Sequence, residues 1–406
     1  MTEERSPPTL LTIPPEIREE IYRLILHPDA NRQYLDNDYT SYNYVAALVL
    51  FRINRQIYLE SRKVFRDLNV FVRIETPWPE AQQHVAYEGH VPILVTKEKA
   101  LQFSNHSLNV SIDAPDHVTM EIDTERFIVL QEDLPKFTRM WYYADLSYPG
   151  LNERLRLKLE LRDPFAREWE EQRMTKLVQR KLLLPFGEVK GLGDTIFEGD
   201  LKPYGSIEQE LRSAQREHHR SPEHCLREAS RLKFEGNAQL KEGNYHAALQ
   251  LYNQAWEAIH VVIKGRKRHI HGDIFFGREL TEEPFVGKNG QAERLLLRVH
   301  LVANTCLVYL KLEEYEECYY WGMRSIEMLR EAMGVDGRRS ISPEDEAVLE
   351  FPGRDQMGKI YYRTAVASKM MDVLDEARKL LRVAKIYLPN DQNVDKEIAA
   401  TALRLA

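Results

Sequence analysis

Cysteine is scarce in this sequence of 406 residues, and long hydrophobic runs are absent. Cys225, Cys306 and Cys318 are an odd and sparse set, which favours reduced thiols over a disulfide framework. The longest apolar run, from Tyr44 to Phe51, is far too short to span a bilayer. We therefore expect a cytoplasmic protein with no membrane partner.

An excess of positive charge is also absent. Lysine and arginine number 56 against 63 aspartates and glutamates, which gives a net charge of −7. Such a chain has no bulk field that would gather nucleic acid or anionic lipid, so we expect no nucleic-acid partner. The first residues, Met1 to Arg5, are polar, and no apolar signal segment follows them.

Length and composition fit a globular protein of two or three domains. The predicted fold class is an α+β N-terminal module followed by an all-α superhelix of three helix pairs plus a cap helix. The expected divisions are a helical module at 1–72, a small β-rich α+β region at 73–200, a linker at 201–220 and a helical domain with two insertions at 221–406.

The middle of the chain alternates with the period of a β-strand. Leu155, Leu157, Leu159 and Leu161 share one face, and charged residues share the other. The segments Leu108–Ile112 and Val118–Ile122 repeat the pattern. We expect an antiparallel sheet with one exposed charged face, and strands confined to about residues 70–200.

The last region repeats itself. Small residues recur at matching offsets in three segments: Gly236, Ala248 and Ala255, then Cys306, Cys318 and Ser325, then Ala365, Ala377 and Ala384. Small residues let antiparallel helices approach closely. The pattern resembles the TPR repeat, a helix pair of about 34 residues that needs at least three copies, with 393–406 as the cap helix.

The resemblance implies a TPR superhelix from Ser221 onward, similar to the TPR domains of large immunophilins. Insertions at 260–290 and 331–357 separate the copies. We expect this region to be entirely helical, and a sheet within it would overturn the repeat interpretation and the carboxylate clamp that depends on it.

TPR co-chaperones carry a carboxylate clamp with Lys-x-x-x-Asn in the first helix, Asn in the third and Lys-x-x-x-Arg in the fifth. In this sequence the motif falls on five residues, Lys233, Asn237, Asn304, Lys359 and Arg363. Residues four apart share one helix face, so each pair can meet a single ligand. The resemblance implies binding of the acidic C-terminal tail of a heat-shock chaperone of the 70 or 90 kDa class, because cations and amides suit adjacent carboxylates.

The N-terminus begins with a Pro14-Pro15-Glu16 helix start, followed by apolar positions at helical spacing. This segment resembles the first helix of an F-box, and 51–61 resembles the matching helix of F-box-like modules abundant in filamentous fungi. The resemblance implies docking on a Skp-type adaptor of a cullin ubiquitin ligase through Ile13, Pro14, Ile17, Ile21 and Leu24. The alternative is that these side chains pack the N-terminal core.

Other signals give no catalytic or metal site. His260, His269, His271 and Asp273 match no standard zinc spacing, so we expect a polar loop, no metal and no cofactor. The basic run 264–268 has the composition of a nuclear-import patch, which leaves the nucleus as a second compartment, although a solvated charge run is the commoner meaning.

The favoured function is therefore a non-enzymatic adaptor that links a chaperone tail to a ubiquitin ligase. Two alternatives stay open. One is a degenerate immunophilin-like peptidyl-prolyl isomerase, and the other is a scaffold that binds a different acidic C-terminus.

Overall fold

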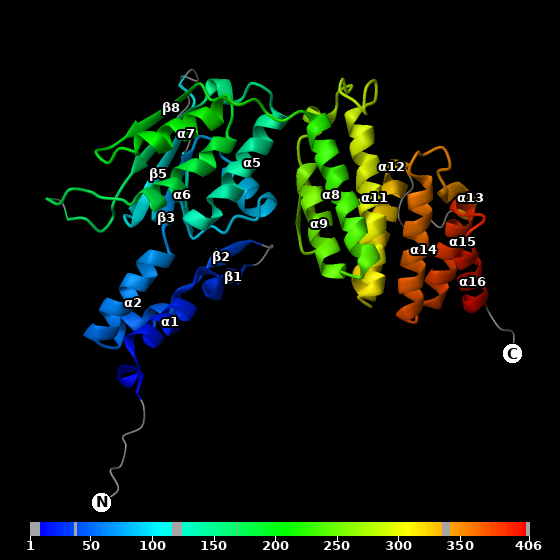
Figure 1. The fold of residues 1–406 in the computed structure, drawn as a ribbon, viewed down its shortest axis with the longest axis horizontal. Coiled ribbons are helices and arrows are strands. Elements are labelled where there is room, and N and C mark those ends of the chain that lie inside the picture. Colours follow the sequence, from blue (N-terminus) through cyan, green and yellow to red (C-terminus); the bar gives the residue numbers. More distant parts are fainter. Residues whose placement is uncertain (1–8, 36–38, 116–123, 168, 335–341, 403–406) are drawn as a thin grey trace, which may run out of the picture. The chain divides into compact units, whose positions relative to one another are not determined.

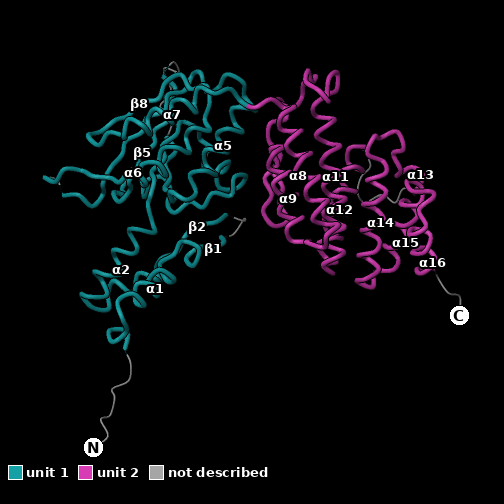
Figure 2. The backbone as a smooth tube through the Cα atoms, viewed as in Figure 1, with its two compact units in different colours: residues 1–219 teal, residues 220–406 magenta. Residues whose placement is uncertain are grey.

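The computed structural model describes residues 9–35, 39–115, 124–167, 169–334 and 342–402. The chain divides into two compact units, residues 1–219 (unit 1) and residues 220–406 (unit 2) (Figure 2). Each unit has hydrophobic core clusters of its own.

Unit 1 begins with two packed helices, α1 (Pro15–Leu26) and α2 (Arg55–Leu68) (Figure 1). Asn54 caps α2, because its Oδ1 accepts a hydrogen bond of 2.9 Å from the backbone N–H of Ile57. Tyr22 and Leu26 of α1 are buried in one cluster with Ile57 and Val64 of α2. Burial of these side chains holds the two helices together.

A short antiparallel pair, β1 (Arg32–Tyr34) and β2 (Thr40–Tyr42), lies in the segment between α1 and α2. The prediction that strands are confined to about residues 70–200 is therefore wrong. Tyr42 of β2 is buried, and its hydroxyl donates a hydrogen bond of 2.7 Å to Asp133. This bond connects the β1–β2 segment to the next part of unit 1.

The central sheet has six strands in the order β4-β6-β3-β5-β7-β8. Their bounds are β3 (Phe71–Thr76), β4 (Val95–Thr96), β5 (His106–Asp113), β6 (Glu125–Leu130), β7 (Arg156–Leu161) and β8 (Asp194–Glu198). The sheet is mixed, since β3 pairs with β5 and β7 pairs with β8 in parallel. The prediction of an antiparallel sheet is wrong for these pairs, because helical crossovers connect them. The predicted strand at Val118–Ile122 lies outside the described residues.

One face of the sheet is buried, as the alternation predicts. Leu155, Leu157, Leu159 and Leu161 are buried, and Arg156, Lys158 and Glu160 are only partly exposed. Three helices cover the buried face: α5 (Leu134–Ser147), α6 (Lys176–Leu183) and α7 (Gly205–Arg216). Two short helices, α3 (Ala81–Gln83) and α4 (Lys97–Gln102), lie between β3 and β5.

The prediction of a linker at 201–220 is wrong. Most of it forms α7, whose Ile207 and Leu211 are fully buried in the core under the sheet. Isoleucine and leucine four residues apart on one face give the segment an apolar stripe, and burial of that stripe makes it part of unit 1.

Unit 2 contains three helix pairs followed by one more helix in its described part. The bounds are α8 (Pro222–Glu242) with α9 (Tyr245–Ala258), α11 (Gly290–Lys311) with α12 (Tyr315–Ala332), α14 (Arg354–Met370) with α15 (Leu374–Tyr387), and α16 (Gln392–Thr401). Connections of two or three residues make each pair antiparallel (Figure 1). An α+β part followed by a helical part is thus the architecture of the chain.

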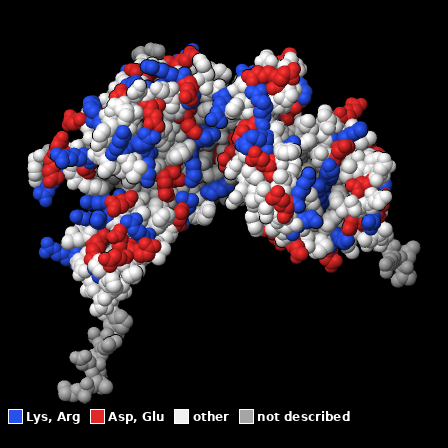
Figure 3. All heavy atoms as spheres, viewed as in Figure 1, with Lys and Arg blue, Asp and Glu red and all other residues white. Residues whose placement is uncertain are grey.

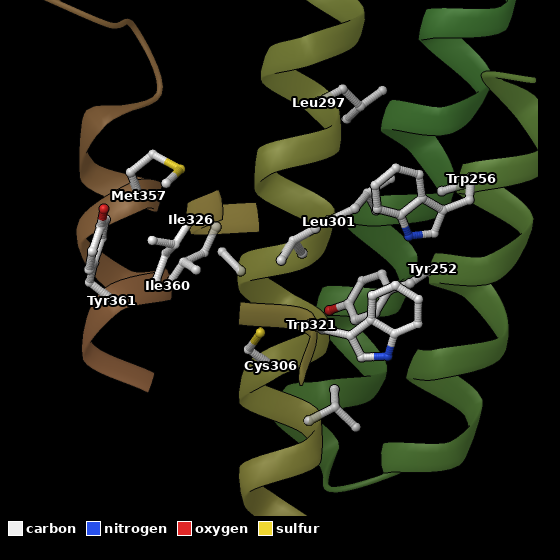
Figure 4. Packing of buried hydrophobic residues seen from close by; sticks show 14 of the residues in the cluster. Tyr252, Trp256, Leu297, Leu301, Cys306, Trp321, Ile326, Met357, Ile360 and Tyr361 are labelled. Atoms are coloured by element: carbon white, nitrogen blue, oxygen red, sulfur yellow. The ribbon is translucent and has the colours of Figure 1, made fainter. Parts of the chain in front are cut away.

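Close helix approach within the first pair depends on Gly236. A Cβ atom at this position would lie 2.5 Å from Cε1 of Tyr252, so only glycine allows the ring of α9 to pack against α8. The buried aromatic and aliphatic side chains between the helices, among them Tyr252, Trp256 and Trp321, form one continuous core (Figure 4).

The expectation that unit 2 is entirely helical is wrong. A hairpin of β9 (Val261–Lys264) and β10 (Lys267–Ile270) lies in the first insertion, followed by the short helix α10 (Asp273–Phe276). By the criterion of the sequence analysis the hairpin counts against an uninterrupted helical repeat, but it is confined to the insertion at 260–290 and leaves the three helix pairs outside it intact. It belongs to none of the helix pairs, and the second insertion adds only α13 (Pro343–Glu346) among its described residues. Across the described ranges, no helix is both long and apolar enough to cross a bilayer.

Candidate functional site

The five expected clamp residues come from three neighbouring helices. Lys233 and Asn237 lie on α8, Asn304 lies on α11, and Lys359 and Arg363 lie on α14. Helix α11 packs against both α8 and α14. All five side chains are partly buried, and Figure 3 shows basic side chains gathered between α11 and α14.

The two asparagines are in direct contact. Oδ1 of Asn237 accepts a hydrogen bond of 2.6 Å from Nδ2 of Asn304 and one of 2.8 Å from the hydroxyl of Tyr252. This network joins α8, α9 and α11, and it leaves Nδ2 of Asn237 and Oδ1 of Asn304 to contact a ligand.

Arg363 lies beside the same network. Its guanidinium donates a hydrogen bond to the backbone carbonyl of Ala303, which directly precedes Asn304. Burial lowers the pKa of Arg363. Burial also raises the pKa of Tyr252 to about 12, an effect that the nearby charge of Arg363 opposes. Arg363, Tyr252 and the asparagines therefore share one polar centre.

Lys233 contacts His300, and the charge of Lys359 also acts on this imidazole. The distance from Nζ of Lys233 to Nδ1 of His300 is 3.4 Å. Burial, followed by the charges of Lys233 and Lys359, lowers the pKa of His300 to about 4. Burial also lowers the pKa of Lys233. Lys233 of α8 and Lys359 of α14 therefore both influence His300 of α11.

Lys233, Lys359 and Arg363 have no counter-ion among the residues that the structure describes, since no carboxylate there lies within ion-pair distance of them. Partly buried positive charges are costly without an anion. An arrangement of this kind can accept a carboxylate from a ligand.

The sequence analysis missed His300 and the polar role of Tyr252. His300 lies one helical turn before Asn304, so the same four-residue spacing that joins Lys233 to Asn237 indicates it. The ring of Tyr252 is fully buried between α8 and α9, and its hydroxyl orients Asn237.

The predicted adaptor-docking residues lie largely at the surface. Ile17 is 52% exposed and Leu24 is 67% exposed. Pro14 is exposed, and Ile13 and Ile21 are partly exposed. The alternative, that these side chains pack into the N-terminal core, does not hold for Ile17 and Leu24.

The core-facing side of α1 is the adjacent one, formed by Arg18, Tyr22 and Leu26. Arg18 is buried because Nε and NH2 donate hydrogen bonds of 2.9 and 2.7 Å to Glu60 of α2. Tyr22 donates a third bond, of 3.0 Å, to the same carboxylate. Hydrogen bonding from Arg18 lowers the pKa of Glu60 to about 2.

The basic run 264–268 is only partly solvated, since Arg266 is exposed but Lys264, Lys267 and Arg268 are partly buried. It forms the turn and flanks of the β9–β10 hairpin. Arg266 pairs with Glu317 at 2.7 Å, and the guanidinium of Arg268 lies 4.5 Å from the ring centroid of Trp256 and 3.9 Å from that of Trp321. Burial and two neighbouring arginines lower the pKa of Arg268 to about 9.

The first insertion also contains His260, His269 and His271, which the sequence analysis assigned to a polar loop. No group of three or more potential ligands is close enough to hold an ion within the described ranges. Instead, Arg294 of α11 donates hydrogen bonds to the backbone carbonyls of Ile259, His260 and His271. These bonds fasten the insertion to the helices.

We compared the chain with protein families and with solved structures. No protein-family model matches the chain, and no solved structure matches it.

Proposed function

We propose that unit 2 is a TPR superhelix that binds the free C-terminus of a partner protein, as an adaptor rather than an enzyme. The observation that carries the proposal is the group of cations on α8 and α14, without carboxylate partners among the described residues, on either side of the Asn237–Asn304 pair. A chain terminus with an acidic last residue brings two adjacent carboxylates to such a group. The acidic tail of a heat-shock chaperone of the 70 or 90 kDa class has this chemistry.

The amides and cations divide the recognition between them. Asparagine side chains can bond to the backbone of an extended peptide, and the lysines and arginine bond to its carboxylates. Binding needs no reacting group.

A pair of peptides tests this function directly. A peptide that ends in Glu-Glu-Val-Asp with a free carboxylate should bind the full-length protein, and its C-terminal amide should bind much more weakly. Isothermal titration calorimetry measures both affinities. Equal affinities would mean that the five residues are surface charge alone.

The position of His300 predicts proton uptake on binding. With its pKa lowered to about 4, His300 is neutral at pH 7; it contacts Lys233 of α8, and the charge of Lys359 of α14 also acts on it. A bound carboxylate offsets the lysine charges and raises the pKa of the imidazole, so affinity should rise as the pH falls from 7.5 to about 5. Calorimetry in buffers of different ionisation enthalpy measures the uptake. His300→Gln should abolish it, and buffer-independent enthalpies in the wild type would contradict the prediction.

A second function is proposed for the exposed apolar face of α1. Ile17, Leu24 and Ile25 are exposed along one side of the helix, and Ile21 lies between them. A contiguous apolar face at the surface indicates a docking site for another protein. We propose that it docks on a Skp-type adaptor, which would link the partner of unit 2 to a cullin ubiquitin ligase.

Leu24→Glu and Ile17→Glu should each abolish capture of the purified Skp-type adaptor in a pull-down, because each places a charge in the apolar contact. Thermal stability should change little, since both side chains are exposed. Glu20→Gln, also on the exposed surface of α1, is the matched control and should retain capture. If the wild-type protein never captures the adaptor, the ligase role fails.

A further inference from the structure

Unit 1 contains a cleft between α2 and the segment that follows β7. Its volume is about 500 Å³. Helix α2 forms one wall, and residues 162–165 and 173–178 form the other. The docking face of α1 is not part of its lining.

Basic side chains outnumber acidic ones in the lining of the cleft. Lysine and arginine contribute five side chains and aspartate contributes two. The basic residues are Arg62, Lys63, Arg66, Arg162 and Arg173. Arg173 pairs with Glu171 at 2.8 Å. The other four have no carboxylate within ion-pair distance among the residues that the structure describes.

The contacts of these guanidinium groups are with aromatic side chains and with a histidine, and not with carboxylates. Burial lowers the pKa of this histidine, His106, to about 4, so it is neutral at pH 7. The guanidinium carbon of Arg66 lies 3.6 Å from the ring centroid of Phe165. NH1 of Arg62 donates a hydrogen bond of 3.1 Å to the hydroxyl of Tyr58. NH1 of Arg162 lies 3.0 Å from Nε2 of His106. Such contacts orient the charges without neutralising them.

The like charges also repel one another. Arg62 and Arg66 lie one turn apart on α2, where like charges destabilise a helix. Burial, and next the charge of Arg62, lower the pKa of Arg66. The free protein therefore keeps a strained group of cations that an anion in the cleft would relieve.

We propose that this cleft binds a phosphoserine or phosphothreonine side chain of a partner peptide. A phosphomonoester is close to a dianion at neutral pH, and its oxygens match the planar donor fork of arginine. The cleft also has an apolar rim, since Leu59 is 49% exposed and Phe165 is 42% exposed. These side chains would contact the residues that flank the phosphate, which favours a peptide over a free ion.

A synthetic heptapeptide with a central phosphoserine between alanines, labelled with fluorescein, serves as the probe. Anisotropy titration of the full-length protein should detect binding of this peptide and not of its unphosphorylated form. Arg62→Gln combined with Arg66→Gln should weaken binding roughly tenfold or more, because contacts to the charged phosphate are lost. Arg55→Gln removes the same charge from an exposed position of α2 outside the cleft and should leave the affinity unchanged.

Other ligands give separate outcomes. Inorganic phosphate should compete only weakly, and competition at the affinity of the peptide would overturn the peptide as the source of the phosphate. Tight binding of an oligouridylate that depends on Arg62 and Arg66 would assign the cleft to nucleic acid and overturn the proposal.

Two controls separate a binding defect from a folding defect. Lys63→Gln changes an exposed lining residue, which the fold does not need, and should also weaken the phosphopeptide. An equal loss in Arg55→Gln, or equal affinity for the two peptides in the wild type, would overturn the proposal.

Discussion

Lys359→Ala should weaken binding of a peptide with a free, acidic C-terminus by roughly ten- to a hundredfold. The estimate follows from hydrogen bonds to charged groups, which contribute about 1.5–3 kcal/mol each. Lys359 suits the test because it is only partly buried and makes no ion pair within the described ranges. Its removal should leave the fold intact, so the lost affinity measures recognition.

Arg363→Ala should have an effect of the same size on affinity, with an added effect on stability. Arg363 of α14 donates a hydrogen bond to the carbonyl of Ala303 in α11, and its removal breaks this contact between the two helices. A lower thermal midpoint is therefore expected for Arg363→Ala and not for Lys359→Ala.

Lys379→Ala is the matched control for both variants. Lys379 lies on α15, is 72% exposed and pairs only loosely with Glu376, at 3.8 Å. Calorimetry should give the wild-type affinity for this variant. Added salt should weaken the wild-type complex moderately, because partly buried contacts are screened less than exposed ones. A loss in Lys379→Ala as large as in Lys359→Ala would attribute the binding to general charge.

The local pattern predicted the helix pairs well because they depend on short-range spacing. Ala248, Ala255, Cys306 and Cys318 are all buried, as small residues at those offsets should be. The resemblance to the carboxylate-clamp motif pointed to Asn237 and Asn304, which the structure brings into contact. His300 follows the same spacing and could have been found.

The β9–β10 hairpin could not be predicted from its own residues with the same ease. Val261, Val262 and Ile263 are typical of a strand, and Gly265 has a φ of +55° in the turn. The charges that follow are typical of a loop. The packing of Arg268 between Trp256 and Trp321 supports the hairpin, and these three residues are distant in sequence.

The exposure of the apolar face of α1 could not be predicted from the local sequence either, because it depends on a residue that is distant in the chain. Periodicity assigns the apolar residues to the core and the charged residues to the solvent. Arg18 reverses this assignment, because its partner Glu60 lies 42 positions away on α2. A buried ion pair between distant residues leaves no trace in the local pattern.

Arg294→Met should destabilise unit 2 by about 3–5 kcal/mol, the largest effect expected for any single change discussed, because it leaves buried carbonyl groups without a hydrogen-bond donor. Arg294 is fully buried and is the largest such side chain in the described part of the chain. Its bonds to the carbonyls of Ile259 and His271 measure 3.0 and 2.6 Å. Methionine keeps the volume but leaves these carbonyls buried and unbonded, at about 1–3 kcal/mol each.

The ion pair between Arg294 and Asp273 contributes less to the stability of unit 2 than the carbonyl bonds do. Asp273 pairs with Arg294 at 3.0 Å, but its side chain is 68% exposed, so solvent screens the charge. Asp273→Asn should therefore cost less than about 1 kcal/mol, which separates the role of the carbonyl bonds from that of the ion pair.

Differential scanning calorimetry of the full-length protein can resolve this effect, because the two units need not unfold together. For a unit of this size each kcal/mol shifts the midpoint by about 2–4 °C, so the transition of unit 2 should fall by roughly 6–20 °C. Arg227→Met is the matched control, since Arg227 also joins a helix to the insertion, through Glu282, but is 41% exposed. A shift in Arg294→Met no larger than in Arg227→Met would mean that the insertion is held by its hydrophobic contacts, and that the buried guanidinium contributes little to the fold.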